Sequence, residues 1–189
     1  MRHSDIIGRI EENPIIAAVR EESDVEEATN SPVSTVFLLH GDIFNIKAMV
    51  DRIKAAGKNV LIHIDFLEGI GKDNRALDYI CEVIKPHGII STKNNHIKYA
   101  MEKGMFTIQR VFLIDSMSYA NSVKTAQAVK PDMVEVMPGV MPNVLKRISG
   151  QLSMPVIAGG LIETKEEILE ILNSGVVGVS TGKKELWGL

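Results

Sequence analysis

Two stretches near the C-terminus, PVIAGGLIET (residues 155–164) and GVVGVSTGKKELW (residues 175–187), share the pattern that decides the fold. Each opens with a short apolar run containing β-branched residues, and each run stops at small residues, Gly-Gly in the first and Ser-Thr-Gly in the second. Continuous apolar runs without alternation are typical of parallel strands buried on both faces. The intervening ETKEEILEILNSG (163–175) has apolar residues at helical spacing, so it predicts a helix that joins two parallel strands.

The same strand-then-helix pattern continues back through the whole chain. Apolar runs lie at residues 14–19, 34–39, 59–64, 87–92, 105–113, 132–137, 155–160 and 175–180. Segments with helical spacing lie between them, at 42–57, 73–86, 94–104, 116–131 and 163–175. Eight such units favour a closed (β/α)8 barrel, and an open doubly wound parallel sheet is the alternative.

Chain length and composition limit the architecture and the cellular setting. The chain has 189 residues, fewer than the roughly 250 of a typical barrel. We therefore expect one domain over residues 1–189 with short loops and a short last helix in KKELWGL. The N-terminus is charged and no run is long and apolar enough to span a membrane, and Cys81 is the only cysteine. These features predict a cytoplasmic protein without an intramolecular disulfide.

The small residues that end the last two strands suggest a phosphate site. Backbone N–H groups bind phosphate only where no Cβ blocks their approach, which suits Gly159, Gly160 and Gly182. The Ser180 and Thr181 hydroxyls are further donors, Lys183 adds charge, and a helix after STGK would direct its N-terminal amides at the anion. The alternative is that Gly-Gly forms a tight turn and Ser-Thr-Gly begins a helix, with no ligand.

Polar residues also stand at the ends of the other predicted strands. They are Arg20, His63, Asp65, Lys93, Gln109, Arg110 and Glu135. A charged residue in an apolar strand is costly unless it is paired or meets a ligand. Lys93 and Glu135 are the two that we expect to be functional, whereas ion pairs at a barrel rim would explain Asp65, Arg110 and Glu135 equally well. His63 by itself is expected to be a hydrogen-bonded core histidine, and Asp115 is expected to cap the helix that follows it.

Metal and cofactor motifs are missing from the sequence. The five histidines are scattered without HxH or HExxH spacing, and there is no GxSxG, Walker A or GxGxxG motif. We therefore predict no metal and no cofactor.

An ordered set of motifs gives a more specific indication. NPIIAAVR, HIDFLEGIGKD, GIISTK, QRVFLIDS, PDMVEVMPGVMP, PVIAGGLI and STGKKELW follow one another from residue 13 to residue 187. Together they resemble the glycerol-3-phosphate responsive antiterminator family. The resemblance implies a small (β/α)8 barrel that binds glycerol 3-phosphate and an mRNA leader, preventing a transcription terminator from forming.

The resemblance also implies roles for individual residues. Gly159, Gly160, Leu161, Ser180 and Thr181 would hold the phosphate, with Gly182 in a place where the family pattern leads us to expect a serine. Asp65, Lys93 and Glu135 would meet the glycerol end, and Arg20 and Arg110 would line the pocket.

The functional expectation is a ligand-gated, RNA-binding regulator of glycerol uptake and metabolism genes, not an enzyme. With a net charge of -3, an RNA surface has to be local. The candidates are Lys124, Lys130, Lys146, Arg147, Lys183 and Lys184, which a solvated helix surface explains equally well. The alternatives are a phosphate-binding barrel enzyme acting on a small phosphorylated polyol or sugar (an isomerase, lyase or phosphodiesterase) and a sensor that contacts protein alone. A homo-oligomer is left open.

Overall fold

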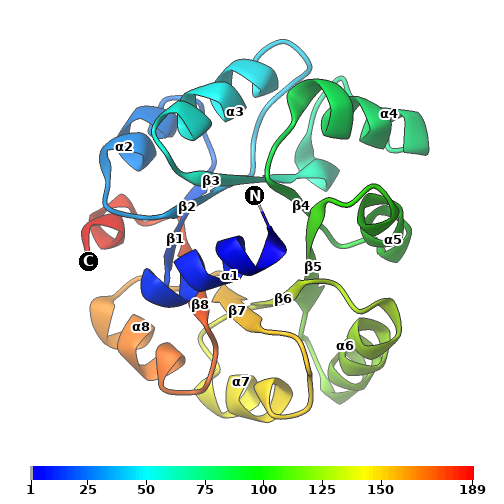
Figure 1. Ribbon diagram of the computed structural model, residues 1–189. Helices are drawn as coiled ribbons and strands as arrows, with labels where there is room; N and C mark the ends of the chain where they lie inside the picture. The colour runs from blue at the N-terminus through cyan, green and yellow to red at the C-terminus, as the bar shows by residue number, and fades with distance from the viewer. Residues whose placement is uncertain (1) are drawn as a thin grey trace.

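The computed structural model describes residues 2–189 and contains a closed ring of eight parallel strands (Figure 1). The strands are β1 (Ile15–Val19), β2 (Thr35–Leu38), β3 (Asn59–His63), β4 (Gly88–Ser91), β5 (Phe106–Phe112), β6 (Met133–Met137), β7 (Val156–Gly159) and β8 (Gly178–Thr181). Each strand pairs with the next one, and β8 closes the ring on β1 with Ala17 opposite Thr181. The prediction of a (β/α)8 barrel is confirmed, and the open sheet is excluded.

Helices follow the strands and form an outer layer around the barrel. They are α2 (Asp24–Asn30), α3 (Ile46–Ala55), α4 (Asn74–Tyr79), α5 (Asn94–Glu102), α6 (Ser116–Val129), α7 (Pro142–Ser149) and α8 (Lys165–Leu172). The sequence explains where two of them begin, because Thr164 and Asp115 accept backbone N–H groups in the first turns of α8 and α6. The predicted helix over 73–86 is α4 followed by a π turn, η2 (Ile80–Ile84).

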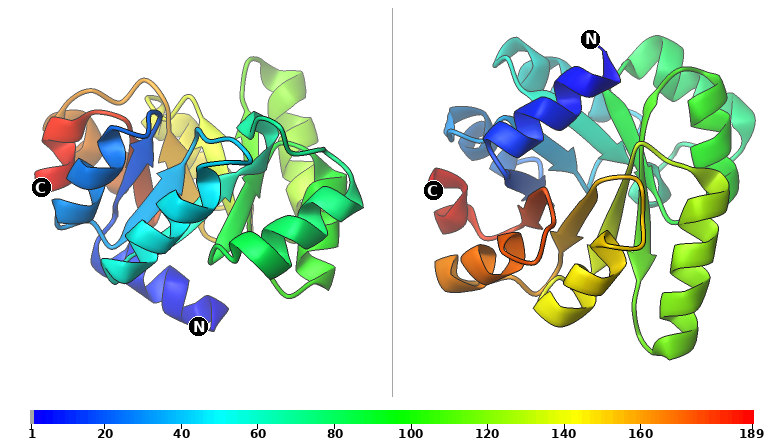
Figure 2. Two further views of the ribbon diagram at one scale, coloured as in Figure 1. Left: turned by 90° about the horizontal axis from the view of Figure 1, so that it is seen from above. Right: turned by 60° about the horizontal axis from the view of Figure 1, so that its bottom comes forward.

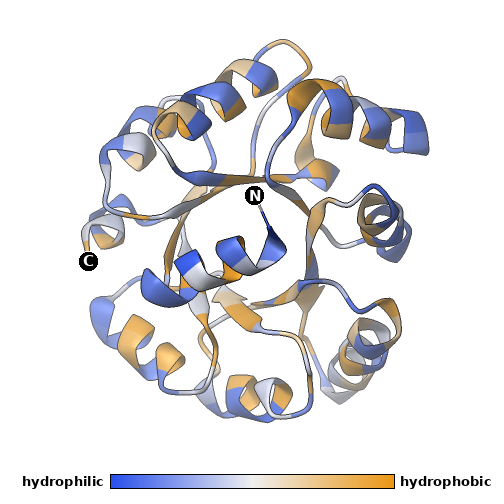
Figure 3. Ribbon diagram, in the orientation of Figure 1, coloured by the Kyte–Doolittle hydropathy of each residue, from blue (hydrophilic) through white to orange (hydrophobic). Residues whose placement is uncertain are grey.

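Apolar side chains form two separate layers, one on each side of the sheet. Outward-facing residues of the strands pack against the apolar faces of the helices, which Figure 3 shows as orange bands. Inward-facing residues fill the middle of the barrel, namely Ile16, Phe37, Leu61, Ile90, Ile108, Met133 and Ile157. The barrel is therefore a packed core, as this architecture requires.

An additional helix, α1 (His3–Glu12), lies across the N-terminal end of the barrel (Figures 1 and 2). Its buried residues Ile6 and Ile10 join the apolar cluster inside the barrel. The sequence indicates only a charged terminus here, because two isoleucines four residues apart do not show what they pack against. Within residues 2–189, no helix is long and apolar enough to cross a membrane.

Candidate functional site

Above the apolar layer, the barrel interior becomes polar at its C-terminal end. Side chains alternate across a strand, so Arg110 lies inward like Ile108, and Glu135 lies inward like Met133. Arg110 Nε donates to Glu135 Oε2 at 2.7 Å, and Ser180 Oγ donates to Glu135 Oε1 at 2.6 Å. Both charged side chains are almost wholly buried. This network joins β5, β6 and β8 across the top of the core.

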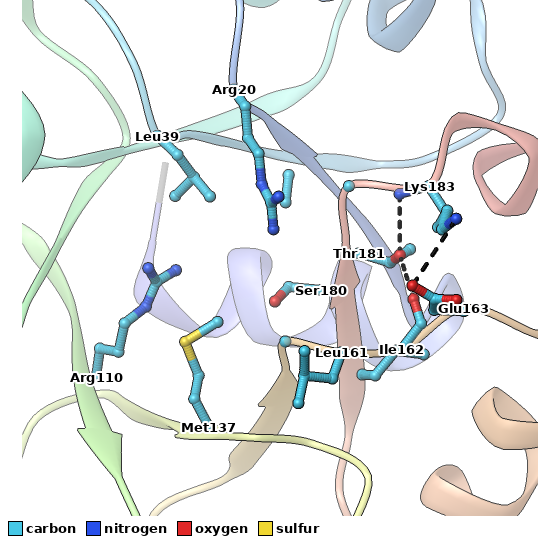
Figure 4. A pocket seen from close by; sticks show the side chains of 13 residues that line it. Arg20, Leu39, Arg110, Met137, Leu161, Ile162, Glu163, Ser180, Thr181 and Lys183 are labelled. Atoms are coloured by element: carbon cyan, nitrogen blue, oxygen red, sulfur yellow. Dashed lines mark hydrogen bonds and ion pairs between the residues drawn. The ribbon is translucent and has the colours of Figure 1, made fainter.

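A pocket of about 200 Å³ opens over this network (Figure 4). It is lined by Ala18, Arg20, Leu39, Arg110, Met137, Gly160, Leu161, Ile162, Glu163, Ser180, Thr181, Gly182 and Lys183. Arg20 and Arg110 reach into it from β1 and β5, on opposite sides of the ring, with Ser180 between them. Three cationic side chains therefore face this pocket, and one acidic side chain, Glu163, lies 3.9 Å from Lys183. This balance favours an anion.

The connections after β7 and β8 bring unpaired backbone donors to the pocket. Within residues 2–189, the N–H groups of Gly160, Leu161 and Gly182 donate to no protein acceptor. Gly160 and Leu161 adopt left-handed backbone conformations, with φ of 81° and 62°, and that conformation is unfavourable for leucine. The loop is held in place because Gly139 N donates to Gly160 O at 3.1 Å. The geometry thus presents free amides, as an anion site requires.

Hydroxyl groups at the same end already have partners in the protein. Ser180 donates to Glu135, and Thr181 Oγ1 donates to Ile162 O at 3.1 Å. Trp187 Nε1 donates to Thr181 O at 2.8 Å and anchors the end of β8. These hydroxyls fix the two loops, so the free donors of the pocket are amides and guanidinium groups.

At this end the structure differs from two predictions made from the sequence. The helix expected after STGK is a five-residue 3₁₀ turn, η3 (Lys184–Gly188), which is too short to direct a set of amides at an anion. Gly159 does not line the pocket, and it has a packing reason to be small. A Cβ there would stand 2.4 Å from Ser180 Oγ and 2.6 Å from Glu135 Oε1.

His63 lies inward on β3, and the expectation that its ring would be hydrogen-bonded is wrong. Both ring nitrogens are buried without a partner, and so is Nη2 of Arg110. Burial, with the nearby Arg110 charge, lowers the pKa of His63 to about 3. The ring stacks on Phe66 with centroids 4.2 Å apart. Buried polar atoms without partners are uncommon, and nothing in the spacing of the sequence marks them.

Asp65 and Lys93 lie apart from the pocket. The Asp65 carboxylate accepts from Ser91 Oγ at 2.9 Å and from the Thr92 amide and hydroxyl at 2.8 Å each. Burial opposes ionisation of Asp65, but these hydrogen bonds outweigh it and lower its pKa. Lys93 is exposed at the start of α5, and Gln109 faces outward, where its amide donates to Asn94 at 2.6 Å.

The structure also separates the basic residues proposed from sequence for RNA. Lys183 lies at the pocket beside Glu163, and Lys184 pairs with Asp24 and Glu27. The other four, Lys124, Lys130, Lys146 and Arg147, lie on or at the end of α6 and α7.

The closed ring and the cationic, amide-lined pocket at the ends of β7 and β8 define a (β/α)8-barrel protein with a candidate ligand site at the C-terminal face. The chain belongs to the glycerol-3-phosphate responsive antiterminator family, whose model matches residues 15–187. The confirmed family is the one that the sequence motifs indicated.

Three relatives cover nearly the whole chain. The uncharacterized protein YgcP of Escherichia coli (strain K12) is 37% identical over 180 residues, covering 95% of this chain and 94% of the relative. The crystal structure of the glycerol uptake operon antiterminator regulatory protein from Listeria monocytogenes has a TM-score of 0.89 and 39% identity, covering 93% of this chain and 95% of the other. A glycerol uptake operon antiterminator-related protein from Thermotoga maritima has a TM-score of 0.83 and 33% identity, covering 93% and 98%.

Proposed function

We propose that this protein senses glycerol 3-phosphate and, as an antiterminator, binds an mRNA leader to regulate glycerol uptake and metabolism genes. The observation that carries the proposal is the pocket in which free amides of Gly160, Leu161 and Gly182 lie with the Arg20 and Arg110 side chains. The family to which the chain belongs is described as responsive to glycerol 3-phosphate.

The charge and size of the pocket support a small phosphorylated ligand. A phosphate monoester carries nearly two negative charges at neutral pH and three strong acceptor oxygens, which the amides and Arg20 can satisfy. The pocket volume of about 200 Å³ is below the roughly 300–1,000 Å³ of pockets for drug-sized ligands. A three-carbon phosphate suits this space better than a nucleotide.

The interior end of the pocket supports recognition of hydroxyl groups. Arg110 lines the pocket and keeps one buried Nη2 without a partner, beside the network of Glu135 and Ser180. That nitrogen is closed off in this structure, so a ligand hydroxyl would accept from it only after the Arg110 side chain shifts, which would remove the cost of an unpaired buried donor. In this proposal Glu135 acts by positioning Arg110. Asp65 and Lys93 lie outside the pocket lining.

The same contacts favour binding over turnover. A lyase working through a Schiff base would need Lys93 in the pocket, but Lys93 is exposed at the start of α5. Glu135, which an isomerase would need as a general base, accepts from Arg110 and Ser180.

The proposal is tested by thermal unfolding in the presence of glycerol 3-phosphate, glycerol, inorganic phosphate, dihydroxyacetone phosphate and a pentose phosphate. We expect selective stabilisation by glycerol 3-phosphate, of about 2.7 kcal/mol at a hundred times its Kd, with the compound recovered unchanged. A stronger response to another sugar phosphate, or consumption of any of the tested compounds, would favour the alternative that the protein is an enzyme.

A variant pair locates the site. Gly182→Val places a side chain beside Arg20, 3.3 Å from its Nε, so the response to glycerol 3-phosphate should disappear. Gly8→Val, in α1 at the opposite end of the barrel with no atom near its Cβ position, is the matched control and should keep the full response. An unchanged response in Gly182→Val would contradict the assignment of the pocket.

A further inference from the structure

The outer surface of α6 and α7 differs in charge from the rest of the protein. From residue 116 to residue 162 the basic residues are Lys124, Lys130, Lys146 and Arg147, and the acidic ones are Asp132 and Glu135. Glu135 is buried against Arg110, and Asp132 is bonded to His3 and Thr107. The α6 and α7 helices therefore carry basic side chains and no acidic one.

Two other sectors of the ring, α8 beside α7 and the more distant α2, carry the opposite charge. The α8 helix carries Glu166, Glu167 and Glu170, and α2 carries Asp24, Glu26 and Glu27. A polyanion approaching this protein of net charge -3 is thus repelled by α8 and α2 and attracted to sectors where basic side chains outnumber acidic ones, such as α6 and α7.

An exposed arginine on this surface is held over an aromatic ring. The guanidinium of Arg147, in α7, lies 4.6 Å from the ring centroid of Tyr119, in α6. The Tyr119 hydroxyl donates to Gln151 Oε1 at 3.0 Å, which fixes the ring. An arginine ordered in this way offers its outer face to an unstacked base, and stacking on guanidinium planes is a common mode of single-stranded RNA recognition.

A groove beside this pair has space for a base. It has a volume of about 240 Å³ and is lined by Leu113, Ile114, Asp115, Ser116, Tyr119, Met141, Val144 and Arg147. Ile114 of this lining is 87% exposed, and Met117, which follows the lining residue Ser116 in sequence, is 73% exposed. Asp115, the acidic residue of this lining, accepts a hydrogen bond from the Ser118 amide as a helix cap. The groove thus combines apolar contact area with an arginine, which suits a nucleobase.

We propose that the α6–α7 surface, defined here as Tyr119, Lys124, Lys146 and Arg147 with the adjoining groove, binds single-stranded RNA. This inference rests on the proposed function and names the surface through which it acts. The excess of basic side chains favours a polyanion over a symmetric dimer, because a two-fold contact would place this basic surface against itself.

The strands that hold the ligand pocket lead directly into the groove. Arg110 on β5 precedes Leu113 by three residues, and Met137 of the pocket precedes Met141 by four. The Leu113 amide donates to Met137 O at 2.8 Å, which ties the two connections together. A ligand that moves Arg110 or Met137 therefore shifts groove residues, so RNA affinity depends on glycerol 3-phosphate.

In the first experiment the intact protein selects RNA from a random single-stranded pool, in the presence and in the absence of glycerol 3-phosphate. Binding of the selected RNA is then measured by fluorescence anisotropy at several salt concentrations. Lys124→Glu/Lys146→Glu should weaken binding at least about tenfold and lower the salt slope by about 2. Lys98→Glu/Lys165→Glu, on α5 and α8, makes the same change in net charge and should leave affinity within about twofold.

A second pair of variants separates stacking from charge. Arg147→Lys keeps the charge but removes the planar group, so we expect about tenfold weaker RNA binding. Tyr119→Phe keeps the ring under the guanidinium and should bind RNA nearly as the parent does. Equal losses in the two double variants, or full affinity in Arg147→Lys, would overturn the assignment of this surface.

The outcomes also separate this inference from the function on which it rests. Thermal stabilisation by glycerol 3-phosphate is expected in all these variants, because none of them changes the pocket. A protein that responds to glycerol 3-phosphate but retains no RNA from the pool would overturn RNA binding altogether. One that retains RNA equally well in every variant would overturn the α6–α7 surface alone.

Discussion

The two ends of the barrel are made from the same eight strands and have opposite chemistry. At the N-terminal end, α1 closes the opening and Ile6 and Ile10 extend the apolar core. At the C-terminal end, the interior holds a buried ion pair and polar atoms without partners. The closed end thus contributes stability, and the open end carries buried polar groups whose cost a ligand can offset.

Two histidines, the half-buried His87 and the fully buried His63, show the contrast within one residue type. His87, at the N-terminal end of β4, accepts the Val60 amide on its Nδ1 at 3.0 Å. His63, at the C-terminal end of β3, has no partner for either nitrogen. Burial lowers both pKa values, to about 4 for His87 and about 3 for His63. The same side chain therefore belongs to the backbone hydrogen-bond scheme at one end of the barrel and lacks a hydrogen-bond partner at the other.

The largest effect is expected at the open end. Glu135→Gln leaves the buried Arg110 charge without its partner and should reduce the free energy of unfolding by about 3–5 kcal/mol, as measured by urea denaturation. The double variant Arg110→Met/Glu135→Met removes both charges and should recover most of this loss while lacking the response to glycerol 3-phosphate. A single variant as stable as the parent would show that the pair is not buried as described.

A smaller effect is expected at the closed end. Ile10→Ala removes a fully buried side chain and should cost about 3 kcal/mol of unfolding free energy. The Kd for glycerol 3-phosphate should be unchanged, because the pocket lies at the far end of the barrel. Glu11→Ala, on the exposed side of the same helix, is the control and should change stability by less than about 0.5 kcal/mol. A changed Kd in Ile10→Ala would mean that the two ends are coupled.

The smallest effect concerns pH. Because the pKa of His63 is about 3 in the folded protein and about 6.5 when unfolded, the unfolded chain binds the additional proton below pH 6.5. The contribution of neutral His63 to the free energy of unfolding is therefore complete above that pH and is lost as the pH falls. Between pH 6.5 and pH 5 the loss from His63 alone is about 2 kcal/mol. Unfolding of His63→Gln at the two pH values should show a correspondingly smaller decrease, and an identical decrease would show that His63 is not buried and neutral.

Much of the architecture was predictable because strand and helix signals are local. All eight apolar runs became strands, and their number indicated a closed barrel. Thr164 and Asp115 were predictable as caps, since a cap depends on residues three positions away. By contrast, the position of α1 was not predictable, because its two buried isoleucines could pack on any apolar surface.

The candidate site was predictable in outline and not in detail. Arg20, Arg110, Gly160, Leu161, Ser180, Thr181 and Gly182 all line one pocket, whereas Gly159, Asp65, Lys93 and Glu135 do not. Alternation along β3 placed His63 and Asp65 on the same side, but Asp65 belongs to the 3₁₀ turn η1 (Ile64–Phe66), where alternation ends. Sequence reasoning also did not anticipate Leu39, Met137, Ile162 and Glu163 in the lining.

The sequence by itself determined the order of strands and helices, the family and the loops after β7 and β8 as the place of the pocket. It could do so because periodicity, capping and small residues at strand ends act over a few neighbouring positions. Only the tertiary structure decided that Glu135 holds Arg110 and Ser180, that His63 keeps two unpaired nitrogens and that Arg147 of α7 lies over the Tyr119 ring of α6. Those properties depend on distances between residues that are far apart in the chain. The closed ring sets these distances.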